Sequence, residues 1–165
     1  LDAAQKDLQS LVEMAGDNPD ALVACCELRY ELGQSMPAVT ELNRILKNHP
    51  DFQKALLLRG RCFACVKNYS LAIADLISYI ELNPDDHVAG IELAKCYLAT
   101  NEIENASMRF EAAINADHSS FDAYHGFSRV FIKKDRLDVA LTQCQKAINI
   151  DSSRAEAFAT KAEIY

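Results

Sequence analysis

Residues 53–86 read QKALLLRGRCFACVKNYSLAIADLISYIELNPDD, and the spacing of the apolar residues in this stretch decides the fold. They recur every three or four residues, as on one face of a helix, in two runs separated by the polar pair Lys67-Asn68. The apolar positions of the two runs are Leu56, Phe63, Val66, Leu71, Ala72, Leu76, Tyr79 and Ile80. The stretch therefore predicts two amphipathic helices joined by a short turn, with Pro84 marking the end of the second.

The same pattern recurs along the chain every 34 residues, in repeats numbered from Pro19, Gln53, His87, Phe121 and Ala155. Residues that share a position number form a column. Position three is always alanine: Ala21, Ala55, Ala89, Ala123 and Ala157. Position twenty is also always alanine: Ala4, Ala38, Ala72, Ala106 and Ala140. Position eight is small: Cys26, Gly60, Ala94, Ser128 and Ala162. Position eleven carries Arg29 and then a ring: Phe63, Tyr97, Phe131 and Tyr165. One hairpin cannot bury its apolar face alone, so the small columns predict closely stacked hairpins.

A 34-residue helix–turn–helix with small residues at positions eight and twenty and a ring at eleven resembles the tetratricopeptide repeat. The resemblance implies an all-α fold: an α-solenoid of stacked helix–turn–helix repeats forming a right-handed superhelix. It also implies a single array over residues 1–165. This array has the second helix of a truncated repeat at 1–18, full repeats at 19–52, 53–86, 87–120 and 121–154, and the first helix of a truncated repeat at 155–165. Position four departs from the family's usual tryptophan, since it reads Leu22, Leu56, Gly90, Tyr124 and Phe158.

Composition narrows the classes of function. The net charge of −7 argues against nucleic-acid binding, which needs a cationic surface to displace the counterions of phosphate. No run of 18 apolar residues is present, so we expect no membrane span, and the N-terminus lacks a signal-peptide pattern. The six cysteines match no small disulfide framework, which favours a reducing compartment such as the cytoplasm.

The resemblance implies that first helices line a concave groove, faced by positions two, five, nine and twelve. Position nine reads Glu27, Arg61, Lys95, Arg129 and Glu163, a basic row on an acidic chain. We expect the groove to bind a protein segment with acidic and aliphatic residues. The predicted binding residues are Lys54, Leu57, Arg61, Ile91, Lys95, Leu98, His125, Arg129 and Lys133. In the alternative interpretation, these cations pair with Glu92 or other groove acids, or are simply solvated.

The sequence predicts no catalytic residue, cofactor or metal site, because no phosphate loop, nucleophile dyad or paired-carboxylate arrangement is present. Cys62-x-x-Cys65 lacks the two further ligands that zinc needs and the strand that precedes a thioredoxin motif. Cys62 shares position ten with Cys96 and Val130, so we expect it to be a buried packing residue, with Cys65 more exposed.

Three functions remain open. The first is a non-catalytic scaffold for protein–protein interaction. The second is the substrate-recognition arm of an enzyme whose catalytic domain lies outside this chain, which fold analogy cannot distinguish from the first. The third is a homo-oligomer that stacks through uncapped ends, where the ring of Tyr165 is expected to be exposed.

Overall fold

The computed structural model describes residues 10–165, which are helices joined by turns with no strand among them. The chain divides into two compact units, Leu1–Leu82 and Asn83–Tyr165. After a short helix at residues 10–15, the first unit contains α2 (Pro19–Glu31), α3 (Ser35–Asn48), α4 (Gln53–Cys65) and α5 (Tyr69–Leu82). The second unit contains α6 (His87–Ala99), α7 (Ile103–Ala116), α8 (Phe121–Lys133), α9 (Leu137–Ile150) and α10 (Ala155–Ile164).

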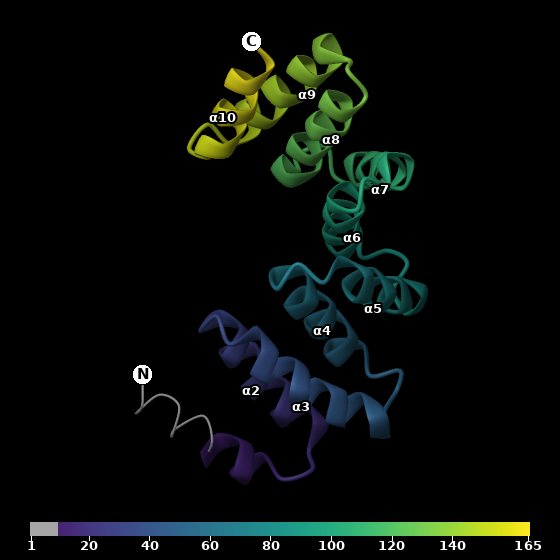
Figure 1. The fold of residues 1–165 in the computed structure, drawn as a ribbon, viewed down its shortest axis with the longest axis vertical. Coiled ribbons are helices and arrows are strands. Elements are labelled where there is room, and N and C mark those ends of the chain that lie inside the picture. The colour runs from purple at the N-terminus through teal and green to yellow at the C-terminus, as the bar shows by residue number, and fades with distance from the viewer. Residues whose placement is uncertain (1–9) are drawn as a thin grey trace. The chain divides into compact units, whose positions relative to one another are not determined.

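Within each unit the helices form hairpins that stack on one another (Figure 1). In the first unit, α2 packs on α3 and α4 on α5, and α3 contacts α4. In the second unit, α6 packs on α7 and α8 on α9, and α7 contacts α8. The predicted all-α fold of stacked helical hairpins is confirmed. The repeat boundaries remain predictions, and residues 1–9 of the proposed first element lie outside the described residues.

The alanine column at position twenty lies where helices meet. Ala38, Ala72, Ala106 and Ala140 at position twenty are all buried, whereas Ala4 lies outside the described residues. The residues at position eight are small because they also lie at a close contact between two helices. A methyl group added at Gly60 would lie 3.0 Å from Cγ of Leu76 and 3.5 Å from the carbonyl oxygen of Ala72. Position eight of a first helix therefore meets positions twenty and twenty-four of the second helix in the same hairpin.

The turn inside each hairpin uses a left-handed residue at position fifteen. Gly33, Lys67, Asn101 and Asp135 have φ values of 74°, 61°, 64° and 56°. The amide that follows closes the turn by donating back to the carbonyl oxygen five residues earlier, as from Asn68 to Phe63 at 2.8 Å. This bond satisfies a carbonyl that the end of the first helix would otherwise leave open.

Lys67→Gly is expected to raise the free energy of unfolding by about 0.5–1 kcal/mol. A left-handed conformation costs a residue with a Cβ atom about 1–2 kcal/mol, and the larger backbone entropy of unfolded glycine removes part of that gain. Urea unfolding followed by circular dichroism measures the change. Gly33→Ala, at the same position of the preceding hairpin, should lower stability, and a stabilised Gly33→Ala variant would contradict this explanation.

Candidate partner-binding site

The predicted binding residues lie on three first helices. Lys54, Leu57 and Arg61 are on α4 of the first unit. The second unit carries Ile91, Lys95 and Leu98 on α6, and His125, Arg129 and Lys133 on α8. Because α6 contacts α8 and α8 contacts α10, the three first helices of the second unit form one surface. We call the surface made by positions two, five, nine, twelve and thirteen of α6, α8 and α10 the first-helix face.

The apolar residues of the predicted site differ in how much surface they offer. Leu98 on α6 and Leu57 on α4 are half-buried, so part of each side chain is available for contact. Ile91, by contrast, is only 6% exposed and offers little surface to a partner. Position five therefore contributes to packing between helices in the α6 repeat.

Two of the predicted lysines are already paired with carboxylates at position two. Nζ of Lys54 lies 2.6 Å from Oδ1 of Asp20, and both side chains are largely exposed. Nζ of Lys95 lies 2.9 Å from Oδ1 of Asp122. For these two lysines, ion pairing within the protein is the interpretation that the structure supports, although exposed pairs of this kind stabilise a protein by only about 0–1 kcal/mol.

Asp122 is the centre of a charged cluster between α6, α8 and the start of α10. Nη1 of Arg154 lies 3.0 Å from its Oδ2 atom, and Lys95 binds the other oxygen. The Arg154 guanidinium also lies 3.8 Å from the centre of the Phe121 ring and bonds to Glu156. Burial acts to raise the pKa of Asp122, but the hydrogen bonds from Arg154 and Lys95 outweigh it and hold the pKa at about 2. The cluster therefore stabilises the fold at neutral pH, and this stabilisation is lost as the pH falls from about 4 toward 2.

Arg129 and Lys133 differ from the paired lysines. Both are exposed and lie one turn apart on α8, and neither forms an ion pair with any of residues 10–165. One turn earlier, Nε2 of the half-buried His125 lies 2.9 Å from Oγ1 of Thr160 on α10. Burial, followed by the positive charge of Arg129, lowers the pKa of His125, so its ring is neutral at pH 7. The first-helix face thus offers two cations that no acid of the described residues pairs with, beside a neutral imidazole.

Cys62 is buried and Cys65 exposed, as the sequence predicts. All six cysteines are free thiols. Burial raises the pKa of Cys62 to about 11 and that of Cys96 to about 11, so both remain protonated at neutral pH. Within residues 10–165, no cluster of three or more histidine, cysteine or acidic side chains is arranged to hold a metal ion. The described helices also include none long and apolar enough to cross a membrane.

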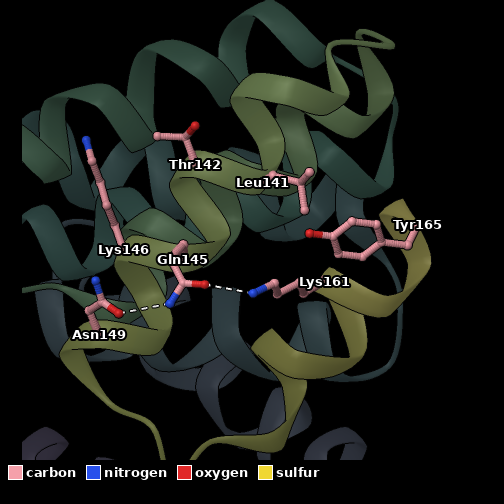
Figure 2. A pocket seen from close by; sticks show the side chains of 7 residues that line it. All are labelled: Leu141, Thr142, Gln145, Lys146, Asn149, Lys161 and Tyr165. Atoms are coloured by element: carbon pink, nitrogen blue, oxygen red, sulfur yellow. Dashed lines mark hydrogen bonds between the residues drawn. The ribbon is translucent and has the colours of Figure 1, made fainter.

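The structure also shows a pocket that the sequence analysis missed. It has a volume of about 420 Å³ and lies between α9 and α10. It is lined by Leu141, Thr142, Gln145, Lys146, Asn149, Lys161 and Tyr165. Figure 2 shows Gln145 between two of these residues: it accepts from Nζ of Lys161 at 2.8 Å and donates to Oδ1 of Asn149 at 2.9 Å. Among its lining residues, the sequence analysis had singled out only Tyr165, as the ring at position eleven.

Curated relatives match most of this chain at low identity. DnaJ protein P58IPK homolog B of Oryza sativa subsp. japonica is 28% identical over an alignment of 145 residues that covers 76% of this chain and 30% of the relative. Anaphase-promoting complex subunit 3 of Schizosaccharomyces pombe is 23% identical over 126 residues, which are 76% of this chain and 19% of the relative. The chain therefore spans less than a third of the length of either relative.

Solved structures and a family profile agree with the observed hairpins. A MamA fragment from Desulfovibrio magneticus RS-1 superposes with a TM-score of 0.82 at 21% identity, covering 93% of this chain and 86% of that one. TTC0263, a thermophilic TPR protein in Thermus thermophilus, superposes with a TM-score of 0.77 at 16% identity, covering 99% of this chain and 89% of that one. The profile described as "Tetratricopeptide repeat" matches residues 1–62. The matched profile and the shared fold support a protein of the tetratricopeptide-repeat family.

Proposed function

We propose that this chain is a protein-interaction scaffold whose first-helix face binds a partner segment carrying acidic and aliphatic side chains. The observation that carries the proposal is the pair Arg129 and Lys133. Unpaired within residues 10–165, these cations lie one turn apart on α8, on a chain with a net charge of −7. A carboxylate placed between them gains two charge-assisted hydrogen bonds without displacing any carboxylate of the described chain.

The other predicted residues have different parts in this proposal. Lys54 and Lys95 contribute little, because a partner must first displace Asp20 or Asp122 and one carboxylate then replaces another. Leu98 supplies half-exposed aliphatic surface on α6, and the neutral ring of His125 supplies contact without charge. Leu57 and Arg61 are candidate contacts on α4 of the first unit and are not part of the first-helix face, whereas Ile91 is buried and supports that face from beneath.

The comparisons support the scaffold class. One relative is, by its name, a subunit of a multiprotein complex, the anaphase-promoting complex. The tetratricopeptide fold offers an extended helical surface of the kind that binds peptides.

Selection from a phage-displayed library of random 12-residue peptides tests the proposal. The wild-type chain should enrich peptides that combine Asp or Glu with Leu, Ile or Val. The double variant Arg129→Glu, Lys133→Glu should lose them, because it places two negative charges where the partner's carboxylate binds. Circular dichroism should show that this variant remains helical.

The matched control is Arg136→Glu, Lys146→Glu. It changes the net charge equally but alters the turn before α9 and α9 itself, where both side chains are exposed. This control should enrich the same peptides as the wild type. If both double variants lose them equally, overall charge rather than this site governs binding, and the proposed site is wrong.

A further inference from the structure

Opposite charges on successive first helices meet at positions nine and two. Lys95 at position nine of α6 binds Asp122 at position two of α8, with 2.9 Å between Nζ and Oδ1. In the first unit, the pKa of Lys54 at position two of α4 is raised, mainly by its hydrogen bond to Asp20 and also by the charge of Glu27 at position nine of α2. A side chain at position nine therefore lies close to position two of the next first helix.

Arg129 is the exception to this pattern. It occupies position nine of α8, and Glu156 stands 27 residues later at position two of α10, the same separation as in the pair between α6 and α8. Both side chains lie close to His125, whose pKa is lowered by burial and then by Arg129, and raised by Glu156. Nevertheless, Arg129 forms no ion pair within residues 10–165, and Glu156 bonds to Arg154 instead.

Arg154, in the turn before α10, holds Glu156 in a fixed arrangement. Its guanidinium bonds to Glu156 and also to Asp122, with 3.0 Å between Nη1 and Oδ2. The same guanidinium lies 3.8 Å from the centre of the Phe121 ring. A planar guanidinium can bind two carboxylates and stack on a ring at once, because its donors lie in one rigid fork. Glu156 is thus bound by the better fixed of the two arginines near it.

The position of Arg154 in the repeat is one that other repeats use for helix capping. Asn18, Asp86 and Ser120 occupy position thirty-four before α2, α6 and α8, and each side chain accepts a backbone N–H of its helix. Phe52 and Arg154 at the same position form no such cap. An arginine has donors and no acceptor, so it cannot cap a helix N-terminus. What Arg154 provides here is its bonds to the two carboxylates.

We propose that Arg154 is a positioning residue of the partner-binding site, which keeps Arg129 open to a partner's carboxylate by holding Glu156 away from it. This inference rests on the proposed function of the first-helix face. Without Arg154, Glu156 becomes the internal partner of Arg129, as Asp122 is of Lys95. A partner's carboxylate must then displace Glu156 before it binds. Arg154 therefore determines which cation at position nine is available to a partner.

Thermodynamic coupling between Arg129 and Glu156 tests this exchange without any peptide. Urea unfolding of Arg129→Gln, Glu156→Gln and the double variant gives the coupling as the deviation from additivity. In the wild-type background the two substitutions should be additive. In the Arg154→Gln background the pair should change the equilibrium constant for unfolding by about threefold, as expected for an exposed ion pair. Additivity in both backgrounds, or equal coupling in both, would overturn the proposal.

Isothermal titration with an acidic and aliphatic peptide selected on the wild type measures the effect on binding. Arg154→Gln should bind about threefold more weakly, because the peptide competes with an exposed internal pair. Adding Glu156→Gln to this variant should restore the wild-type affinity. Circular dichroism should show that both variants remain helical.

The matched control combines Arg154→Gln with Asp151→Asn. Asp151 lies within range of the charge of Arg154, so its substitution restores the same net charge, and the asparagine oxygen can still accept the bond from the Ser153 amide. Glu156 stays in place, so this variant should bind as weakly as Arg154→Gln alone. Equal recovery with Asp151→Asn and with Glu156→Gln would show that net charge governs the affinity and would overturn the role of Arg154.

The two proposals fail in different ways. If Arg129→Glu, Lys133→Glu keeps the wild-type affinity for the peptide, the proposed function is wrong, and so is the role of Arg154 in it. If that double variant loses the peptide but Arg154→Gln binds it like the wild type, only the role of Arg154 is wrong.

Discussion

Asp75→Ala is expected to lower the free energy of unfolding by about 3–5 kcal/mol. Asp75 on α5 is buried and accepts from Nε of Arg59 at 2.7 Å and from Nη2 at 2.6 Å. The third nitrogen of the guanidinium donates to Asn43 of α3 at 2.8 Å, so Arg59 joins three successive helices. Removing the carboxylate leaves a largely buried guanidinium without its counter-charge, which is the costly way to break a buried ion pair.

Urea unfolding of the variant measures this loss. The control is Asp20→Ala, which removes the acid of the exposed pair between Asp20 and Lys54 and should cost about 1 kcal/mol or less. The contrast tests whether burial, rather than the presence of an ion pair, determines the stabilisation. Equal losses in the two variants would contradict this account of Asp75.

Gly126→Ala is expected to lower the free energy of unfolding by roughly 1–3 kcal/mol. A methyl group at this position would lie 2.2 Å from Cε1 and 2.3 Å from Cζ of Phe110. Phe110 on α7 is fully buried, so its ring cannot turn away without moving the core between α7 and α8. Overpacking of this kind outweighs the gain of about 1 kcal/mol that alanine brings to a helix interior.

Gly90→Ala is the matched control. Gly90 also lies inside a first helix, but no atom beyond its chain neighbours and the nearby backbone of its own helix lies within 4 Å of its added methyl group. This variant should therefore become more stable by about 0.5–1 kcal/mol. A second check is Phe110→Leu combined with Gly126→Ala, whose loss should be smaller than the sum of the two single losses. Stabilisation of Gly126→Ala would show that the ring of Phe110 yields easily and would refute the overpacking argument.

Much of the fold could be predicted from local patterns. Three- and four-residue spacing fixes which face of each helix is buried, and small residues such as Gly60 and Ala72 mark close helix contacts. The polar pairs between the two apolar runs of each repeat located the turns. They did not predict the left-handed residue in each turn, because the hydrogen bond that closes the turn requires that conformation whatever the residue type. Lys67 and Asp135 adopt the left-handed conformation, although a glycine, as at Gly33 in the first hairpin, adopts it at a lower energetic cost.

The site could be predicted only in outline. Position numbers identified the basic row, but the partners of Lys54 and Lys95 are carboxylates 34 and 27 residues away, which depend on how helices stack. The neutral state of His125 likewise depends on its burial beside Arg129. Sequence columns treated Ile91 as available surface, because they cannot show how deeply a side chain lies between two helices.

The central claim is that Arg129 and Lys133 bind the acidic residues of a partner segment. Its most direct test is isothermal titration of the wild-type chain and of Arg129→Glu, Lys133→Glu with one acidic and aliphatic peptide selected on the wild type. Our account predicts that the double variant binds at least tenfold more weakly, a loss of about 1.4 kcal/mol or more, while Arg136→Glu, Lys146→Glu binds like the wild type. Equal affinity for the wild type and Arg129→Glu, Lys133→Glu would contradict it.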